Sequence, residues 1–156
     1  MELFIISLVS YLVGSIPFGF LLTKIFLNKD IRNIGSRNIG ATNALRTGNK
    51  KIGFSTLILD ILKAAITIIF VKFNYSEFIF ISSLCVFLGH VFPIWLKFKG
   101  GKGVATYVGI LFSINLTYGL IFITIWLFVF FIFKYSSLSS IIASLSIPLY
   151  LFIFLN

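Results

Sequence analysis

The chain has 156 residues, of which 59% are hydrophobic, 11% are charged and 20 are phenylalanines. A soluble domain of this length has too little polar surface to cover so much apolar side chain, so the composition excludes a soluble fold and indicates an integral membrane protein. The net charge of +9 would also suit a nucleic-acid-binding protein. The basic residues, however, gather in loops between apolar segments, where membrane topology and contacts with anionic lipid or phosphate explain them. No nucleic acid is expected as a partner.

The apolar segments are long enough to cross a bilayer as helices, which takes about 20 residues each. They cover residues 3–22, 54–71, 78–96, 104–119, 120–133 and 138–155. The fourth and fifth form one apolar run, in which Asn115 and Gly119 mark the place where the chain can turn. We predict an all-α, polytopic membrane bundle that forms a single domain over residues 1–156, with about six transmembrane helices, or five as the alternative.

Basic residues cluster in three predicted loops, at about 23–53, 97–103 and 134–137. Because short loops rich in lysine and arginine stay in the cytoplasm, we expect all three loops there and the N-terminus outside. The chain starts with Met1 and Glu2 and has no basic leader region, so the first apolar segment is expected to be a retained span.

The first loop is rich in groups that bind phosphate. Residues 35–46 read Gly-Ser-Arg-Asn-Ile-Gly-Ala-Thr-Asn-Ala-Leu-Arg. Arginine binds phosphate through two parallel hydrogen bonds, and hydroxyl and amide groups donate to phosphate without adding charge. A solvated loop that only obeys the charge rule for cytoplasmic loops is the alternative.

The second loop places Gly100, Gly101, Lys102 and Gly103 directly before an apolar helix. Successive backbone N–H groups at the start of a helix form an anion site, which the positive end of the helix dipole favours. The spacing does not fit the nucleotide-binding P-loop, so no nucleotide is implied. The alternative is a flexible turn whose lysines only set topology.

Few titratable groups lie within the spans. Asp60 and Lys63 are three residues apart on one helix face, and we expect them to neutralise each other. His90 is a general base, an orienting group or simply a hydrogen-bonded helix residue, and because position 95 is Trp95 it cannot form the histidine–aspartate pair of common glycerolipid acyltransferases. Asp30 is the other carboxylate near the basic loops, which is too few oxygen ligands for a metal site.

A third polar cluster spans residues 134–140, Lys-Tyr-Ser-Ser-Leu-Ser-Ser. Its serines are expected to cap the helix that follows, and the alternative is that they complete a phosphate pocket.

Residues 36–46 and 89–106 resemble the first and second signature motifs of the bacterial acyl-phosphate:glycerol-3-phosphate acyltransferases, the PlsY family. The resemblance extends to residues 59–64 and 134–140, and so to nearly all of the chain. Two positions depart from the family pattern, since Arg37 and Ile39 stand where glycine and proline are usual.

This resemblance implies a multi-pass enzyme of the bacterial inner membrane that transfers a fatty acyl group from acyl phosphate to the 1-hydroxyl of glycerol 3-phosphate. The products are lysophosphatidic acid and phosphate, no acyl-enzyme forms, and no cofactor or metal takes part. An enzyme that produces acyl phosphate is expected as a functional partner. The implied catalytic residues are Ser36, Arg46 and Lys102, and the implied substrate-binding residues are Asn38, Gly40, Thr42, Asn43, His90, Gly100, Gly101, Gly103, Ser137 and Ser140.

The family pattern also includes a seventh span and a third cytoplasmic motif with histidine and asparagine, and the 156 residues contain neither. The alternatives are a non-catalytic or truncated homologue, or a small anion carrier that binds phosphorylated metabolites with the same loops.

Overall fold

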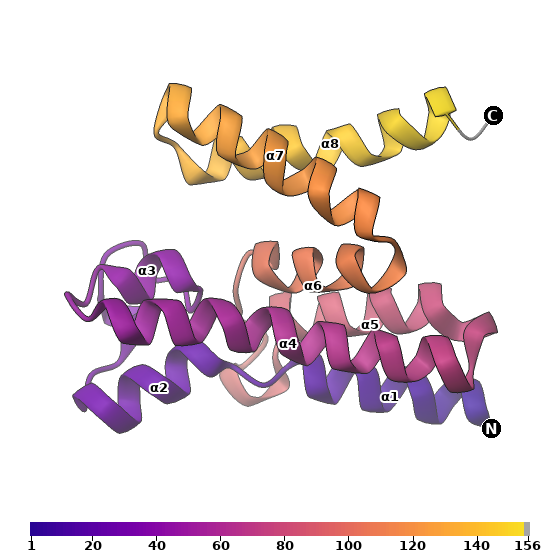
Figure 1. Cartoon of the computed structure of the whole chain (residues 1–156). Helices are drawn as coiled ribbons and strands as arrows, with labels where there is room; N and C mark the ends of the chain where they lie inside the picture. The colour runs from indigo at the N-terminus through magenta and orange to yellow at the C-terminus, as the bar shows by residue number, and fades with distance from the viewer. Residues whose placement is uncertain (155–156) are drawn as a thin grey trace. The chain divides into compact units, whose positions relative to one another are not determined.

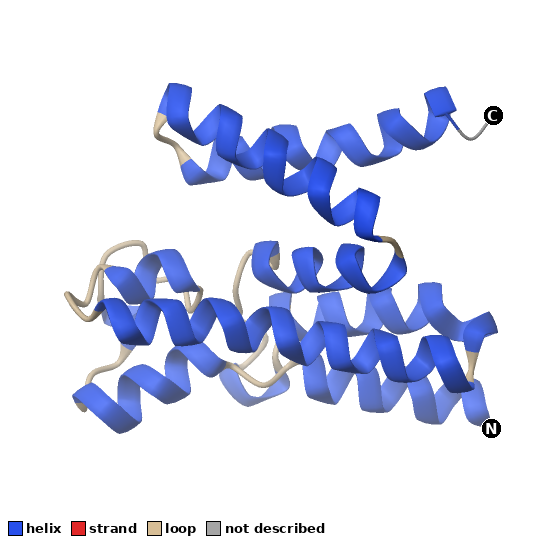
Figure 2. Ribbon diagram, viewed as in Figure 1, coloured by secondary structure: helices blue, strands red, loops and turns tan. Residues whose placement is uncertain are grey.

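The computed structural model describes residues 1–154, and within them the chain is helical with short connections and no strand (Figure 2). The prediction of an all-α fold is confirmed. The α-helices are α1 (Glu2–Gly14), α2 (Phe18–Leu27), α3 (Ala41–Leu45), α4 (Lys50–Asn74), α5 (Ile79–Val91), α6 (Val104–Ile114), α7 (Leu116–Phe133) and α8 (Ser136–Phe154). Three single-turn 3₁₀ helices stand between them, η1 (Ile31–Asn33), η2 (Ser76–Phe78) and η3 (Ile94–Leu96).

Five helical stretches of the described chain are long and apolar enough to cross a membrane, which is the number that the sequence left as the alternative. They are Glu2–Leu27, Lys50–Asn74, Ser76–Leu96, Leu116–Phe133 and Ser136–Phe154. The predicted fourth span differs from expectation, because α6 has 11 residues. At a rise of 1.5 Å per residue it covers about 16 Å, roughly half of the hydrocarbon thickness.

The first span is interrupted, although its hydropathy predicts one continuous helix over residues 3–22. α1 ends at Gly14 and α2 begins at Phe18, with Pro17 as the residue before the second helix. Proline has no N–H to donate and keeps the residue before it, Ile16, out of the helical region. The expected single helix is therefore two shorter ones.

The chain divides into two compact units, Met1–Ile110 and Leu111–Asn156. In the second unit α7 and α8 pack as a hairpin. Asn115 ends α6 and caps α7, because its Oδ1 accepts the N–H of Thr117 at 2.8 Å. This confirms Asn115 as a turning point in the long apolar run. The single domain over residues 1–156 stays a prediction.

In the first unit, α1, α4 and α5 pack on one another (Figure 1). α1 and α5 approach closely because Gly14 faces the Val86 carbonyl, and a Cβ at Gly14 would collide with it. The hydroxyls of Ser10 and Ser82 meet at 2.8 Å in the same buried interface. Small residues and hydroxyl pairs are the usual means by which membrane helices associate without a hydrophobic driving force.

One end of the first unit carries both polar loops. A buried cluster there consists of Ile31, Ile39, Ala44, Ile52 and Leu96, with Phe20, Leu22 and Leu27 packed against it. Leu96 directly precedes the glycine-rich loop, and the other core members belong to residues 31–52. The two loops lie far apart in sequence, and this shared core fixes them together.

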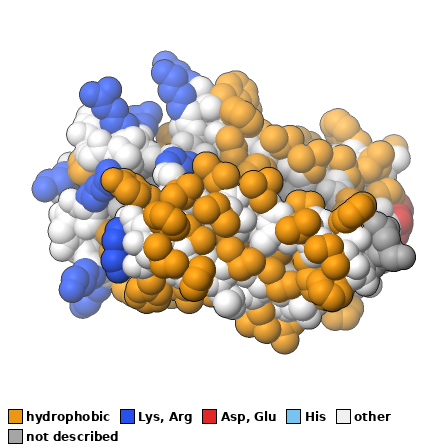
Figure 3. All heavy atoms as spheres, turned by 90° about the horizontal axis from the view of Figure 1, so that it is seen from above, with side chains coloured by type: hydrophobic (Ala, Val, Ile, Leu, Met, Phe, Trp, Pro, Cys, Tyr) orange, Lys and Arg blue, Asp and Glu red, His pale blue; other side chains and the backbone are white. Residues whose placement is uncertain are grey.

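The N-terminus lies at the opposite end of this unit from α3 (Figure 1). In Figure 3 hydrophobic side chains cover much of the visible surface, and Lys and Arg side chains gather together rather than being spread over it. This separation of charge from apolar surface is what a bilayer requires of a protein that crosses it.

Candidate active site

The first loop is organised by the amide of Asn43, which is 2% exposed. Its nitrogen donates to the backbone carbonyls of Ile31 at 3.1 Å, Ile34 at 3.0 Å and Asn38 at 2.7 Å. Its Oδ1 accepts the N–H of Ser36 at 3.0 Å. The sequence predicted a substrate contact for Asn43, whereas every polar contact described for its side chain is to the loop itself.

The predicted catalytic residues of this loop, Ser36 and Arg46, are both exposed and lie close together. The Arg46 side chain crosses Gly35, where a Cβ would lie 2.7 Å from Arg46 Cδ. Gly35 also has a positive φ of 50°, which glycine adopts without strain. Gly35 therefore serves to bring the guanidinium beside the backbone of Ser36.

The remaining predicted residues of the loop form the start of α3. Gly40 precedes the helix, and its N–H donates to Asn38 Oδ1 at 2.9 Å, so the Asn38 carboxamide holds a tight turn. Thr42 lies in the first turn of α3 with its side chain exposed. Asn38 and Ser36 are both hydrogen-bonded to the buried Asn43, which fixes the two residues relative to each other.

A surface ion pair lies at the start of the first loop, around η1. Arg32 Nη2 lies 2.7 Å from Asp30 Oδ2, and the Arg32 N–H donates to Asp30 Oδ1 at 2.9 Å. The hydrogen bonds from the Arg32 side chain lower the pKa of Asp30 below its ordinary value of 3.8. Asp30 is thus charged at neutral pH and pairs with Arg32 at the surface.

The glycine-rich loop turns back onto the end of α5. The N–H of Gly100 donates to the Val91 carbonyl and the N–H of Gly101 to the His90 carbonyl, each at 3.1 Å. The sequence led us to expect these amides to face an anion. In the structure they satisfy the carbonyl groups that α5 leaves unpaired at its C-terminus, so they are not available to a phosphate.

Close packing explains why these positions are glycines. A Cβ at Gly100 would collide with the backbone carbonyl of His90, and a Cβ at Gly101 would collide with the His90 imidazole. Gly103 has a φ of 78° and lies against the Phe87 ring. The exposed Lys102 therefore projects from a loop whose backbone is fixed by its neighbours.

Behind this loop, three titratable residues meet in the interior. Asp60, Lys63 and His90 are 1%, 5% and 3% exposed. Lys63 Nζ lies 2.8 Å from Asp60 Oδ1 and 2.9 Å from His90 Nδ1, and Asp60 Oδ1 lies 3.5 Å from His90 Nδ1. The expected neutralisation of Asp60 by Lys63 is confirmed as an ion pair, although the angles at Asp60 Oδ1 do not meet those of a hydrogen bond.

Lys63 also reaches the break in the first span. Its ammonium donates to the Ile16 carbonyl at 2.8 Å and lies 5.7 Å from the centre of the Phe18 ring. A helix that ends inside a membrane leaves carbonyls that need donors, and a cation is favoured at such a negative helix end. The buried Lys63 ammonium therefore supplies a hydrogen-bond donor to a carbonyl at the break in the first span, and that carbonyl supplies an acceptor to the ammonium.

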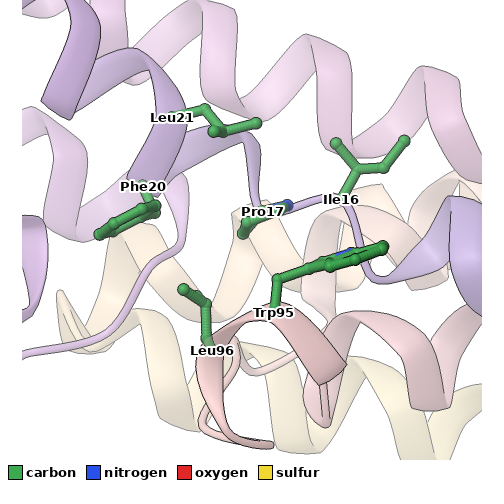
Figure 4. A pocket seen from close by; sticks show the side chains of 6 residues that line it. All are labelled: Ile16, Pro17, Phe20, Leu21, Trp95 and Leu96. Atoms are coloured by element: carbon green, nitrogen blue, oxygen red, sulfur yellow. The ribbon is translucent and has the colours of Figure 1, made fainter.

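An apolar pocket of about 320 Å³ opens beside this break (Figure 4). It is lined by side chains from the α1–α2 connection, from α2 and from η3. These are Ile16, Pro17, Phe20, Leu21, Trp95 and Leu96. The pocket is thus adjacent in sequence to the glycine-rich loop, which starts at Lys97.

The second unit holds the remaining two predicted residues. Ser140 Oγ accepts the indole N–H of Trp126 at 3.0 Å and donates to the Ser136 carbonyl at 2.8 Å. Ser137 is exposed in the first turn of α8. The hydrogen bonds of Ser140 join α7 to α8, which adds a structural role to the two that the sequence suggested.

The sequence did not predict that His90 would join Asp60 and Lys63. The spacing of 27 residues between Lys63 and His90 has no periodic meaning, because the contact depends on how α4 crosses α5. The available signal was the free-energy cost of placing charged side chains such as Asp60 and Lys63 within a membrane span. Because of that cost, a polar residue in the neighbouring span, His90, was a candidate partner for them.

Together, the fold and the two loops define a multi-pass helical membrane protein with a cationic, hydroxyl-rich surface at one end of an apolar body. A family profile described as glycerol-3-phosphate acyltransferase matches residues 4–156. The glycerol-3-phosphate acyltransferase of Pelagibacter ubique is 69% identical over the whole chain, which covers 82% of that relative. The one from Bartonella henselae is 51% identical over 94% of this chain and 72% of its own length.

Solved structures agree with the sequence comparison. The crystal structure of PlsY (YgiH), an integral membrane glycerol 3-phosphate acyltransferase, in its glycerol 3-phosphate form has a TM-score of 0.90 and 36% identity, over 98% of this chain and 78% of that one. The lysophosphatidic acid form has a TM-score of 0.87 at 35% identity, over 98% and 77%. The chain belongs to the glycerol-3-phosphate acyltransferase family, as the resemblance of its two motifs predicted.

Proposed function

We propose that this protein transfers a fatty acyl group from acyl phosphate to the 1-hydroxyl of glycerol 3-phosphate, releasing lysophosphatidic acid and phosphate. The main support is the core in which Leu96 packs with Ile31, Ile39 and Ala44, because it keeps the two loops to which we assign the substrates together at one end of the first unit. The relatives' glycerol 3-phosphate and lysophosphatidic acid forms support the acceptor and the product.

The acceptor is assigned to the exposed cationic groups. Arg46 and Lys102 bind the phosphate of glycerol 3-phosphate, and Ser36 hydrogen-bonds the same substrate. All three side chains are exposed at the loops. An arginine held beside a serine by Gly35 offers a phosphate both charge and directed donors.

The donor is assigned to the same surface and the pocket next to it. The acyl phosphate head lies along the glycine-rich loop near Asn38 and Thr42, and its acyl chain enters the apolar pocket that starts at Trp95 and Leu96. An apolar pocket with polar groups at one end is the usual form of a lipid-substrate site. Ser137 and Ser140 belong to the second unit, and this assignment does not depend on them.

The reaction is a single displacement at the acyl carbonyl. The 1-hydroxyl oxygen forms a bond to the carbonyl carbon, the bond from that carbon to the phosphate oxygen breaks, and the hydroxyl proton passes to the departing phosphate. The mixed anhydride is already activated, so no protein nucleophile is needed. Holding the two substrates in contact lowers the barrier by about 7–11 kcal/mol at best, and Lys102 stabilises the charge that develops on the leaving phosphate.

The loops are assigned to the cytoplasm and the N-terminus to the outside of a bacterial inner membrane. The support is the concentration of basic residues at the end of the first unit opposite the N-terminus. Ser36→Cys and Lys99→Cys, each combined with Cys85→Ala, are expected to react with an impermeant thiol reagent only from the cytoplasmic side. Labelling of the two positions from opposite sides would contradict both the orientation and the shared site.

The test of the activity is formation of lysophosphatidic acid from acyl phosphate and labelled glycerol 3-phosphate in proteoliposomes. Wild-type protein is expected to give product, and Lys102→Ala is expected to lose nearly all of it. Arg46→Ala is expected to raise KM for glycerol 3-phosphate chiefly, because its guanidinium binds the ground state and transition state alike. Absence of product above the Lys102→Ala level would reject the proposal, and uptake of glycerol 3-phosphate without acyl transfer would favour the carrier alternative.

A further inference from the structure

We propose that Asp60, Lys63 and His90 are positioning residues that fix the glycine-rich loop, residues 97–103, for binding of the acyl donor. This inference rests on the proposed function, because it concerns the loop to which the donor phosphate is assigned. The three residues act through the loop and through the first-span break, and none is proposed to touch substrate.

Burial sets these residues apart from the reacting groups. The side chains of Asp60 and Lys63 are each 2% exposed, and that of His90 is 3% exposed. A buried ion pair generally contributes little net stability, because the cost of removing both charges from water offsets their attraction. Three hydrophobic side chains of similar volume would give a comparable folding stability, so stability alone does not explain why this cluster is polar.

The cluster contacts the loop at two points, both through His90. The backbone carbonyl of His90 accepts the N–H of Gly101 at 3.1 Å. The other edge of the ring, at Nε2, lies so close to Gly101 that a Cβ there would collide with it. The imidazole is therefore held at Nδ1 by the hydrogen bond with Lys63, with Asp60 Oδ1 3.5 Å away, and it supports Gly101 with its opposite edge.

The same cluster fixes the pocket wall. Lys63 donates to the Ile16 carbonyl at 2.8 Å, and Ile16 and Pro17 line the apolar pocket assigned to the acyl chain. Tyr11 Oη donates to the Phe92 carbonyl at 2.7 Å, which ties α1 to the end of α5 beside it. Lys63 thus links, through His90, the glycine-rich loop assigned to the acyl phosphate head with Ile16 in the wall of the pocket assigned to the acyl chain.

The positioning role predicts a selective effect on the donor. Lys63→Met and His90→Ala are expected to raise KM for acyl phosphate about fivefold or more and to leave KM for glycerol 3-phosphate within about twofold. A purely structural role would instead reduce the amount of folded enzyme and lower the apparent kcat with both KM values unchanged. His90→Asn, which keeps a polar atom near the Nδ1 position, is expected to recover part of the loss.

A double-mutant cycle tests the contact between His90 and Gly101 directly. Gly101→Ala is expected to raise the donor KM about tenfold in the wild-type background and less than about twofold in the His90→Ala background, since the three nearest atoms to the added Cβ belong to the imidazole. Gly100→Ala is the matched control. Its Cβ meets the His90 carbonyl oxygen and Pro93, so its effect is expected to be the same in both backgrounds.

The outcomes separate this inference from the proposed function. Wild-type protein that makes no lysophosphatidic acid from acyl phosphate fails the function itself. An active wild type with additive effects of Gly101→Ala and His90→Ala, or with an unchanged donor KM in Lys63→Met, overturns the positioning role alone. Variants that do not fold are recognised by loss of a cooperative thermal transition in detergent, and the conservative His90→Asn variant then decides the matter.

Discussion

Ser36 is tied to Asn43 by a hydrogen bond of 3.0 Å from its backbone N–H to the side-chain Oδ1 of the asparagine. The bond fixes the backbone of Ser36 to the buried Asn43, while the Ser36 side chain stays exposed at the surface. Asn43→Ala would remove this bond and the three hydrogen bonds that the carboxamide nitrogen donates to the carbonyls of Ile31, Ile34 and Asn38. We expect a loss of about 1–3 kcal/mol in unfolding free energy and a higher KM for glycerol 3-phosphate, measured by thermal unfolding and steady-state kinetics.

Asn43→Asp is the informative companion, because it keeps the acceptor for Ser36 and replaces the donor by a second acceptor. It is expected to be at least as damaging as the alanine variant. Asn33→Ala, at an exposed position of η1, serves as control and should change neither quantity. An Asn43→Ala enzyme with wild-type stability and kinetics would show that the loop is fixed by its apolar core alone.

The two carboxylate–cation pairs of the first unit are expected to respond very differently to mutation. Lys63→Met removes the ammonium that lies 2.8 Å from the buried Asp60 carboxylate, at a cost of about 3–5 kcal/mol. Adding Asp60→Leu is expected to restore much of this stability. Arg32→Ala breaks a pair whose side chains are 42% and 29% exposed and should cost about 0.2–1 kcal/mol. Equal losses for Lys63→Met and Arg32→Ala, by thermal unfolding in one detergent, would contradict the burial of the first pair.

The Asp30–Arg32 pair also predicts a pH dependence. Because the folded state lowers the pKa of Asp30 below 3.8, the unfolded state binds the proton more tightly, and the contribution of Asp30 to stability is complete above that value. It is lost as the pH falls through the lowered pKa. The difference in melting temperature between wild type and Asp30→Asn is thus expected to be small and positive at pH 7 and to vanish in strong acid. A difference that grows on acidification would have the wrong sign.

The close crossing of α1 and α5 predicts that size is critical at Gly14. Gly14→Ala places a methyl group against the Val86 carbonyl, and overpacking of this kind costs about 1–3 kcal/mol. Val9→Ala in the same helix changes a residue that is 50% exposed and should have little effect. Thermal unfolding of the two variants in parallel checks the prediction, which fails if Gly14→Ala is as stable as Val9→Ala.

The bond between Trp126 and Ser140 gives the second unit an optical signal. The chain has two tryptophans, so Trp95→Phe leaves Trp126 as the fluorophore. Ser140→Ala then removes the acceptor from the indole N–H, and the emission is expected to move to shorter wavelength. Ser146→Ala, whose hydroxyl bonds only the Ala143 carbonyl, is the control. If the emission is unchanged in Ser140→Ala, the two helices are not joined in this way.

The sequence predicted what composition and local chemistry determine. Apolar length located the long helices, and Asn115 marked the start of α7 because an asparagine side chain caps a helix within two residues of itself. The interruption at Pro17 was harder to predict, since the apolar pattern continues across it and a proline inside a span is commonly tolerated, as Pro148 is within α8.

The candidate site was predicted as a set of residue types, and its geometry was not. The motif of Gly100 and Gly101 suggested amides directed at a phosphate, whereas tertiary contact with α5 uses both N–H groups. Asn43 was grouped with the substrate-binding residues through the resemblance to the family, whereas the described hydrogen bonds of its carboxamide are to the loop itself. In both cases the deciding partner lies outside the motif or on its buried side, where local sequence carries no information.

Much of the site depends on main-chain atoms. Lys63 is bound by the carbonyl of Ile16, Tyr11 by that of Phe92 and Gly101 by that of His90. An alanine scan keeps every one of these oxygens, so alanine at Ile16, Phe92 or His90 does not report on the bonds that their carbonyls accept. Replacing Val91 by its α-hydroxy acid turns the amide after His90 into an ester and weakens the His90 carbonyl as an acceptor for Gly101, which would expose a dependence that conventional mutagenesis cannot detect.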